Sequence, residues 1–188
     1  GHYTAQPYFD DRGMLQRGLA GGETQRLNRK GSRFGVSVSA GPFYAEQARV
    51  WIARIIAARS QGLRMPYPLQ VNQGNAGSAV VDLAGQSGTA LNIRGANAGY
   101  VCREGYYLSI EDENGRHYLH NVETGGRVAA DGTLSITLTS ELRWPFLDGA
   151  SIHFAKPMIE GHIMDDNTSW ALTGDMVTPI QFTLEEAA

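Results

Sequence analysis

The chain has a single cysteine and no long apolar run, and each scarcity excludes a class of protein. With Cys102 alone there is no internal disulfide, which fits synthesis in a reducing cytoplasm. No histidine lies near Cys102 in the sequence, so a buried structural thiol is favoured over a nucleophile. No apolar run approaches the roughly 20 residues of a membrane-spanning helix, so no membrane insertion is expected. No signal peptide is expected either, and Gly1-His2 is interpreted as a cloning scar or a trimmed start.

The common signatures of catalysis and cofactor binding are also missing. The sequence contains no P-loop, no dinucleotide-binding fingerprint and no CxxC pair. Ser87 lies in a Gly-Gln-Ser-Gly run that lacks the G-x-S-x-G spacing of a nucleophile elbow, so a turn is favoured there. Adjacent carboxylates such as Asp112 and Glu113 do not face each other across a cleft, as glycoside hydrolysis requires. The sequence therefore predicts no enzymatic activity and no cofactor.

Two small groups of metal-ligating residue types are interpreted as structural. His117 and His120 stand three apart in a predicted strand, so their side chains point to opposite faces and do not share a metal ion. His162, Asp165 and Asp166 form a run that favours a turn over a calcium site, which needs six or more oxygen ligands. No metal site is predicted.

Basic and acidic residues are unevenly distributed along the chain, although their totals nearly balance. The sequence holds 16 Lys and Arg against 19 Asp and Glu, for a net charge of −3. Residues 1–64 carry ten basic and four acidic side chains, and residues 65–188 carry six and fifteen. The two signs either form solvated faces of one protomer or steer neighbouring subunits together in a ring. The basic part has one lysine and is not rich enough in lysines and interleaved aromatics to predict nucleic-acid binding.

Glycine, by contrast, is abundant, with 23 residues, and part of it falls in turn pairs. These pairs are Asn114-Gly115, Gly125-Gly126, Asp131-Gly132 and Asp148-Gly149. They supply the positive φ angles that tight hairpins need, and short apolar-rich segments separate them. A single β-rich domain over residues 34–188 is therefore predicted. Residues 1–33 are polar and punctuated by glycine, and they are predicted to form an N-terminal arm or long loop.

One helix is predicted, over residues 43–61, after a short strand at residues 34–39. Its apolar residues recur at i, i+3, i+4, i+7 and i+8 and predict a core-facing stripe. The stripe consists of Ala48, Trp51, Ile52, Ile55 and Ile56. Further strands are expected at residues 79–83, 89–94, 106–112, 116–122, 134–138, 151–157, 159–164 and 177–184.

Two groups of side chains are predicted to make contacts between subunits. The first surrounds Pro145, which keeps its neighbours off a central strand and favours an exposed patch of Arg143, Trp144 and Phe146. The second is the set of basic side chains in and next to the arm: Arg26, Arg29, Lys30 and Arg33. Most aromatics are expected in the core, and an exposed subset would alternatively stack on sugar rings.

An ordered series of short motifs runs through the second half of the chain. It comprises Gly85–Gly88 with Leu91, Arg94 and Gly95; Gly105–Ile110; Arg116–His120 with Val122; Ala130–Gly132 with Leu134, Ile136 and Leu138; Leu142-Arg143; Asp148–Ala150 with Ile152, Phe154, Pro157 and Gly161; and Phe182 with Glu186-Ala187. In this order the motifs resemble a family of tail proteins from long-tailed bacteriophages, which is associated with the tail tip near the distal tail protein.

The resemblance implies a fold, a function and a set of partners. The fold would be a small β-barrel or β-sandwich with one flanking α-helix, like that of tail-tube and distal tail proteins. The function would be structural: a ring in the phage tail, commonly a hexamer, that joins the tail tube to the hub or receptor-binding apparatus after synthesis in the bacterial cytoplasm. The alternatives are a tail-tube or tail-completion protein and a carbohydrate-binding β-sandwich module. Higher salt is expected to weaken the ring if opposite charges set its register.

Overall fold

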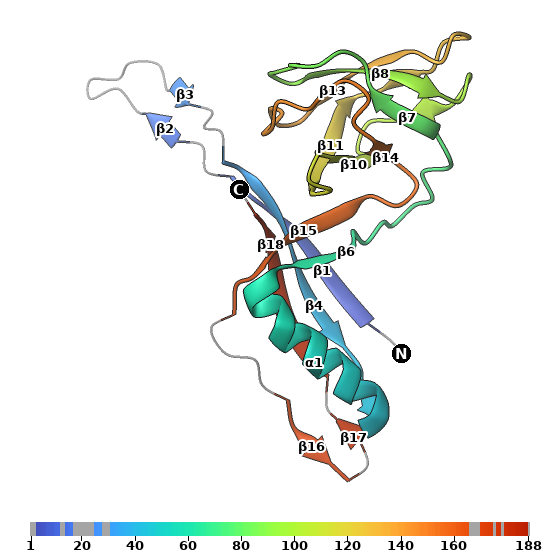
Figure 1. Cartoon of the computed structure of the whole chain (residues 1–188). Helices are drawn as coiled ribbons and strands as arrows, with labels where there is room; N and C mark the ends of the chain where they lie inside the picture. Colours follow the sequence, from blue (N-terminus) through green and yellow to red (C-terminus); the bar gives the residue numbers. More distant parts are fainter. Residues whose placement is uncertain are drawn as a thin grey trace.

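The chain folds mainly as β-structure, with one helix and two lobes (Figure 1). The computed structural model describes residues 3–11, 14–16, 25–27, 31–165, 170–174, 176–177 and 179–187. The described residues form eighteen strands and one helix of 17 residues. These elements, with a curled sheet, confirm the predicted mainly β fold with one flanking helix.

The first lobe is a five-stranded antiparallel sheet. Its strands in spatial order are β1 (Tyr3–Asp10), β4 (Arg33–Ala40), β18 (Ile180–Glu186), β15 (Met158–Ile163) and β6 (Leu63–Pro66). Along β4, Val36 and Val38 are buried, whereas Ser37 and Ser39, which follow them in turn, are partly exposed. Because successive side chains in a strand point to opposite faces, this alternation gives the sheet one apolar and one polar face.

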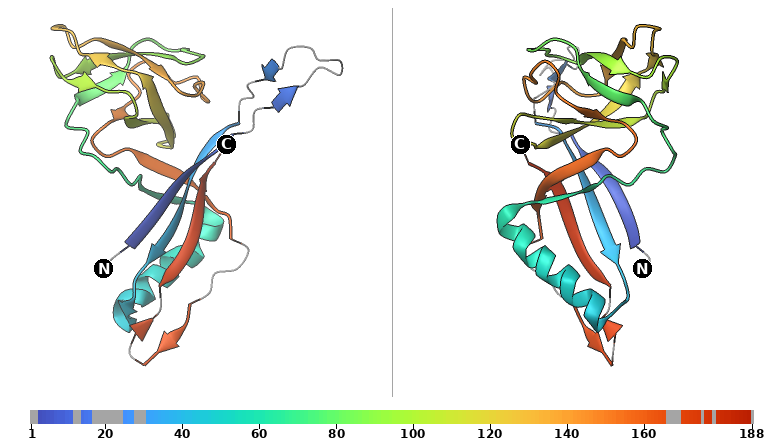
Figure 2. Two further views of the ribbon diagram at one scale, coloured as in Figure 1. Left: turned by 180° about the vertical axis from the view of Figure 1, so that it is seen from behind. Right: turned by 45° about the vertical axis from the view of Figure 1, so that its right-hand side comes forward.

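The helix α1 (Ala45–Gln61) packs against the first lobe on the side of β15 and β6, away from β1 (Figure 2). It begins two residues later than predicted, because β5 (Phe43–Tyr44) pairs instead with β17 (Met176–Val177). The short β16 (Leu172–Thr173) pairs with β17 on its other side. The helix ends at Gly62, whose φ of 78° suits glycine and whose N–H donates to the carbonyl of Ala58 at 2.9 Å.

The core-facing stripe of α1 is narrower than predicted, which corrects the expectation for two residues. Ala48 and Ile55 are buried and Ile52 is half-buried, but Trp51 is 41% exposed and Ile56 is 54% exposed. Ile56 is turned by about 100° from Ile55 on the helix, so it lies at the margin of the contact with the sheet. Trp51 stacks on the ring of Phe43 at a centroid distance of 5.6 Å, which covers it only in part.

The second lobe is a six-stranded antiparallel sheet that curls into a barrel. Its strands in spatial order are β14 (Ile152–His153), β10 (Tyr107–Glu111), β11 (His117–Thr124), β13 (Leu134–Leu138), β8 (Ala90–Ala96) and β7 (Gly77–Val81). The first and last strands meet through a bridge between Val80 and Ser151, next to a 2.9 Å hydrogen bond from Val81 N–H to the carbonyl of Ala150. The short β9 (Val101–Cys102) and β12 (Gly126–Arg127) form a separate pair.

Each lobe has its own hydrophobic core. The core of the second lobe is formed by side chains such as Leu91, Ile110 and Leu138, all fully buried. The core of the first lobe lies between the sheet and α1 and takes in Leu119 from β11. The single domain predicted from residue 34 onwards therefore contains two cores that touch at β11.

Of the glycine-containing pairs predicted to form hairpin turns, one does form such a turn between β10 and β11, and another does not. Between β10 and β11, Gly115 has a φ of 74°, and the Asp112 carboxylate accepts N–H bonds from Asn114 and Arg116, both at 2.8 Å. Gly125-Gly126 instead leads into β12, and this corrects its interpretation as a hairpin turn. A Cβ added to Gly125 would lie 2.1 Å from the Cys102 carbonyl oxygen, so glycine is needed there for close strand approach.

The N-terminal segment predicted as an arm or loop contributes a full strand to the first lobe. β1 pairs with β4 in continuous register from Tyr3 opposite Ala40 to Asp10 opposite Arg33. Beyond it, β2 (Met14–Gln16) and β3 (Gln25–Leu27) pair with each other as a hairpin (Figure 1). The prediction missed β1 because no residue of this edge strand is fully buried, so its sequence shows no clear apolar alternation.

Candidate functional site

A buried carboxylate at the end of β18 connects the two lobes. The Glu186 side chain is 1% exposed. Its Oε1 accepts hydrogen bonds from Leu119 N–H at 2.8 Å and from the Arg143 guanidinium at 2.6 Å. Its Oε2 accepts one from Phe34 N–H at 2.9 Å. Three donors from three separate segments thus neutralise and hold one carboxylate, which compensates for its removal from water.

This arrangement corrects the predicted exposed patch around Pro145. Arg143 pairs with Glu186, and its side chain is only 11% exposed and also donates to the Leu119 carbonyl at 3.0 Å. Phe146 is 1% exposed and packs edge-on against Tyr118 at a centroid distance of 5.4 Å. Both are held inside the protomer because they complete its own core. Trp144 remains 37% exposed, stacked on Tyr118, and is the member of the patch that is open to another molecule.

The basic residues predicted as subunit contacts have different outcomes. Arg33 lies 3.7 Å from Glu185 within the protomer, with 23% of its side chain exposed. Arg26 belongs to β3, and its side chain is not described. Arg29 and Lys30 lie outside the described residues.

The five-stranded sheet has two open edges in the described part of the chain. β1 pairs only with β4, and β6 pairs only with β15. An open edge presents unpaired backbone N–H and C=O groups that another strand can use. β1 is the longer edge, with eight residues, and its Pro7 is compatible with an edge position.

The polar face of the same sheet is a broad groove of about 1030 Å³. Three neighbouring strands line it with short uncharged side chains, namely Thr4, Gln6, Ser37, Ser39, Gln181 and Thr183. Ser37 and Thr183 are register partners whose hydroxyl oxygens lie 3.3 Å apart. Among the described residues, Asp165 is the one charged residue lining the groove, and its carboxylate accepts the N–H of Thr183 at 2.5 Å.

The outward face of α1 carries a second apolar strip. The strip consists of four exposed residues, Val50, Ala53, Ile56 and Ala57. Tyr44, just ahead of the helix, is 65% exposed. An exposed apolar face of this kind on a helix is typical of a surface that contacts another protein.

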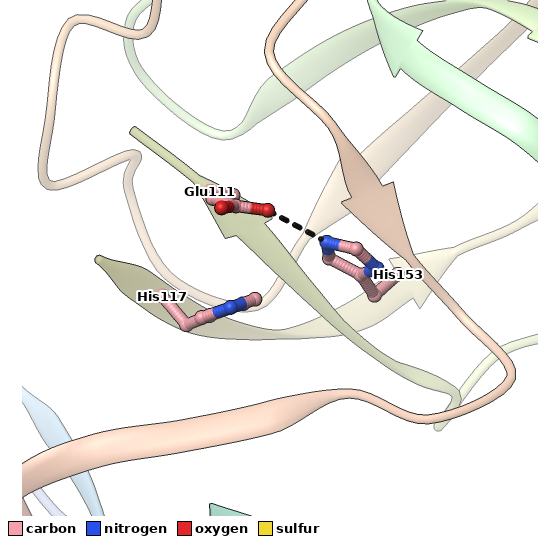
Figure 3. Close-up of side chains that lie close together, drawn as sticks. All are labelled: Glu111, His117 and His153. Carbon is pink, nitrogen blue, oxygen red and sulfur yellow. Dashed lines mark hydrogen bonds and ion pairs between the residues drawn. The ribbon is translucent and has the colours of Figure 1, made fainter. Parts of the chain in front are cut away.

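Three side chains in the second lobe form a compact cluster that the sequence did not predict (Figure 3). They are Glu111 of β10, His117 of β11 and His153 of β14, and their ligand atoms all lie within 4.8 Å of one another. His153 Nε2 and Glu111 Oε2 are 3.2 Å apart, and the two imidazole rings have centroids 5.1 Å apart. His120 is not part of this group: it is fully buried beside Phe146.

The prediction considered the pair His117 and His120 and missed His153. No pattern within one strand could reveal His153, because it joins the cluster through sheet register. β10 lies between β11 and β14, with Glu111 opposite His117 and Ser109 opposite His153. Residues two apart in a strand share a face, so Ser109 and Glu111 point to the side on which both histidines lie.

Burial lowers the basicity of two histidines of β11, His117 and His120. Burial, together with the nearby charges of Arg64 and His153, lowers the pKa of His117 below its usual value. Burial, reinforced by Arg143, lowers the pKa of His120 from 6.5 to about 3. Both side chains are therefore neutral at pH 7.

The remaining sequence-predicted positions behave as structural residues. Cys102 is buried, and burial raises the pKa of its thiol to about 12, so it is protonated at neutral pH. Ser87 is exposed in the connection between β7 and β8. His162 lies in β15 and Asp165 bonds the backbone of β18, while Asp166 is outside the described residues.

The described residues thus provide open sheet edges, an exposed apolar strip on α1 and one cluster of metal-ligating groups. Among the described residues, no helix is long and apolar enough to cross a membrane. Comparison of the chain with models of protein families and with curated proteins finds no match.

Proposed function

We propose that this chain is a structural component of a bacteriophage tail, a ring-forming distal tail protein that joins the tail tube to the hub or receptor-binding apparatus. The observation that carries the proposal is the five-stranded sheet, whose two outer strands have open edges in the described part of the chain and whose polar face is lined mainly by Ser, Thr and Gln side chains. The ordered motifs that resemble tail proteins supply the biological setting. In this proposal the protein acts in the virion after synthesis in the host cytoplasm.

The sheet suits assembly into a closed ring. The edge of β1 on one protomer would pair with an edge of the next, which would satisfy backbone groups that are otherwise open to solvent. When sheets join side by side, their polar faces line one continuous surface. The row of Ser, Thr and Gln side chains would then face the central channel.

The helix faces the other way in this arrangement. Its outer strip, Val50, Ala53, Ile56 and Ala57, is left to contact a neighbouring subunit or tail protein. Part of the charge contrast between the two halves of the chain is already used within the protomer, through Arg33 with Glu185 and Arg64 with Glu160. Attraction between subunits would therefore involve the other basic and acidic residues of the chain.

Electron microscopy of the purified chain in negative stain tests the proposal. Closed rings of one size, with a central channel, are the expected result. Long stacked filaments would favour a tail-tube protein instead. Dispersed monomers that bind an immobilised glycan through Trp144 would favour a carbohydrate-binding module and contradict the ring.

A further inference from the structure

The cluster of Glu111, His117 and His153 has the composition of a metal site. Two imidazoles and one carboxylate are the protein ligands of one common class of zinc site, in which a fourth position stays open. Each ligand comes from a different strand, and β10 holds the other two in register. Their placement therefore depends on the barrel itself and not on a loop.

The distances are close to what a zinc ion requires. Tetrahedral Zn²⁺ with bonds of about 2.1 Å places its donor atoms about 3.4 Å apart. His153 Nε2 and Glu111 Oε2 are already 3.2 Å apart, and the three ligand atoms lie within 4.8 Å of one another. The remaining adjustment is a small side-chain rotation, which the partial exposure of Glu111 and His153 allows.

Neighbouring groups hold His117, the least exposed of the three ligands, in place. His117 is 9% exposed, and Ser109 Oγ lies 3.3 Å from its Nδ1. That hydroxyl is itself fixed, because it accepts the N–H of Met158 at 3.0 Å. Outer contacts of this kind orient a ligating histidine.

The charge of Glu111 is not neutralised by a lysine or arginine in the described structure, since its ion pair is with His153. An adjacent hollow of about 310 Å³ is lined by Glu111, Asp112 and Glu113, and by Asp148, which is paired with Arg94. A concave surface lined mainly by one sign of charge concentrates ions of the opposite sign. The hollow would therefore raise the local concentration of cations beside the cluster.

We propose that Glu111, His117 and His153 bind one divalent transition-metal ion, with Zn²⁺ as the favoured occupant and a fourth position open to water. The ion fastens β14 to β10 and β11, on the side of the barrel where Ser109 contacts β15. This inference stands apart from the proposed tail function, because it rests on the barrel alone.

Zinc titration of the full chain by calorimetry tests the proposal, with His153→Ala as the ligand variant. His153 is suited to replacement because 39% of its side chain is exposed, so the variant is expected to fold. His162→Ala is the matched control, since His162 is also exposed but lies in β15, outside the cluster. Glu111→Gln is a second ligand variant that preserves size and keeps the test valid if His153→Ala is unstable.

The wild type and His162→Ala are expected to bind one Zn²⁺ through the cluster with equal affinity. Both ligand variants are expected to lose at least about tenfold in affinity for that ion. Zn²⁺ should also raise the melting temperature of the wild type but not that of the ligand variants. Absence of binding, or affinity that neither ligand variant reduces, would overturn the proposal.

Discussion

The carboxylate of Glu186 accepts its hydrogen bonds in a place that solvent barely reaches. Removing it would leave the Arg143 guanidinium buried without a counter-charge and the N–H groups of Leu119 and Phe34 without their acceptor. Glu186→Ala is therefore expected to lower the free energy of unfolding by about 3–5 kcal/mol. Glu186→Gln retains an acceptor oxygen and should cost less.

Urea unfolding of both variants, followed by circular dichroism, measures this difference. Glu123→Ala is the matched control, because Glu123 is an exposed glutamate of β11. It should change stability by less than about 0.5 kcal/mol. A loss for Glu186→Ala no larger than that of the control would show that the buried pair does not connect the lobes.

His120 makes stability depend on pH. Its pKa of about 3 in the folded chain lies below the 6.5 of an exposed histidine. Above pH 6.5 the side chain is neutral in both states, so its contribution is fully present. As the pH falls from 6.5 towards 3, only the unfolded chain takes up the proton, and stability drops by roughly 1.4 kcal/mol per pH unit.

His120→Leu isolates this effect, because leucine fills a buried site without titrating. Its free energy of unfolding should fall less than that of the wild type between pH 7.5 and pH 5, by about 2 kcal/mol. Urea unfolding at the two pH values provides the comparison. Equal losses in the two proteins would mean that His120 is protonated without cost in the folded chain.

At the scale of elements, local pattern predicted the strands that alternate most clearly. β13 has the predicted bounds because Leu134, Ile136 and Leu138 alternate with small polar residues. β1 was not predicted, since an edge strand packs on β4 through backbone pairing and needs little apolar surface. The metal-ligand cluster was not predicted either, because it depends on which strands become neighbours, and strand order is a property of the whole sheet.

The helix α1 also shows how far a local sequence pattern can predict structure. The periodicity of residues 48–56 correctly indicated a helix with an apolar side, but not how wide a strip the sheet beneath would cover. Ala48 and Ile55 reach the core, while Trp51 and Ile56 remain largely open. The width of a buried helix face depends on the partner surface, which no local window contains.

The exposed strip on α1 leads to a prediction about assembly. Ile56→Arg is expected to weaken self-association, because a charged group in an apolar contact loses its hydration. The folded protomer should be nearly unaffected, since Ile56 is 54% exposed. Gln61→Arg is the control, because it adds the same charge at another exposed position of the helix. Sedimentation velocity of both variants measures their self-association. Equal association of the two variants would show that the exposed strip of α1 is not part of the interface.

At the scale of the whole molecule, the two lobes differ in how many backbone groups they leave open for pairing with another subunit. The barrel closes its sheet on itself through Val80 and Ser151, so it has few backbone groups left for a neighbour. In the five-stranded sheet, the outer edges of β1 and β6 pair with no other described strand. Assembly through backbone pairing is therefore expected in the first lobe, with the barrel projecting from the ring.

The solution mass of the purified chain, measured by light scattering at two salt concentrations, tests the central claim most directly. The account predicts a discrete oligomer with the mass of a closed ring, which loosens at high salt if charges between subunits set its register. If the mass of the ring is the same at both salt concentrations, apolar and backbone contacts would account for its assembly. A monomer at every concentration and at both salt levels would contradict the account.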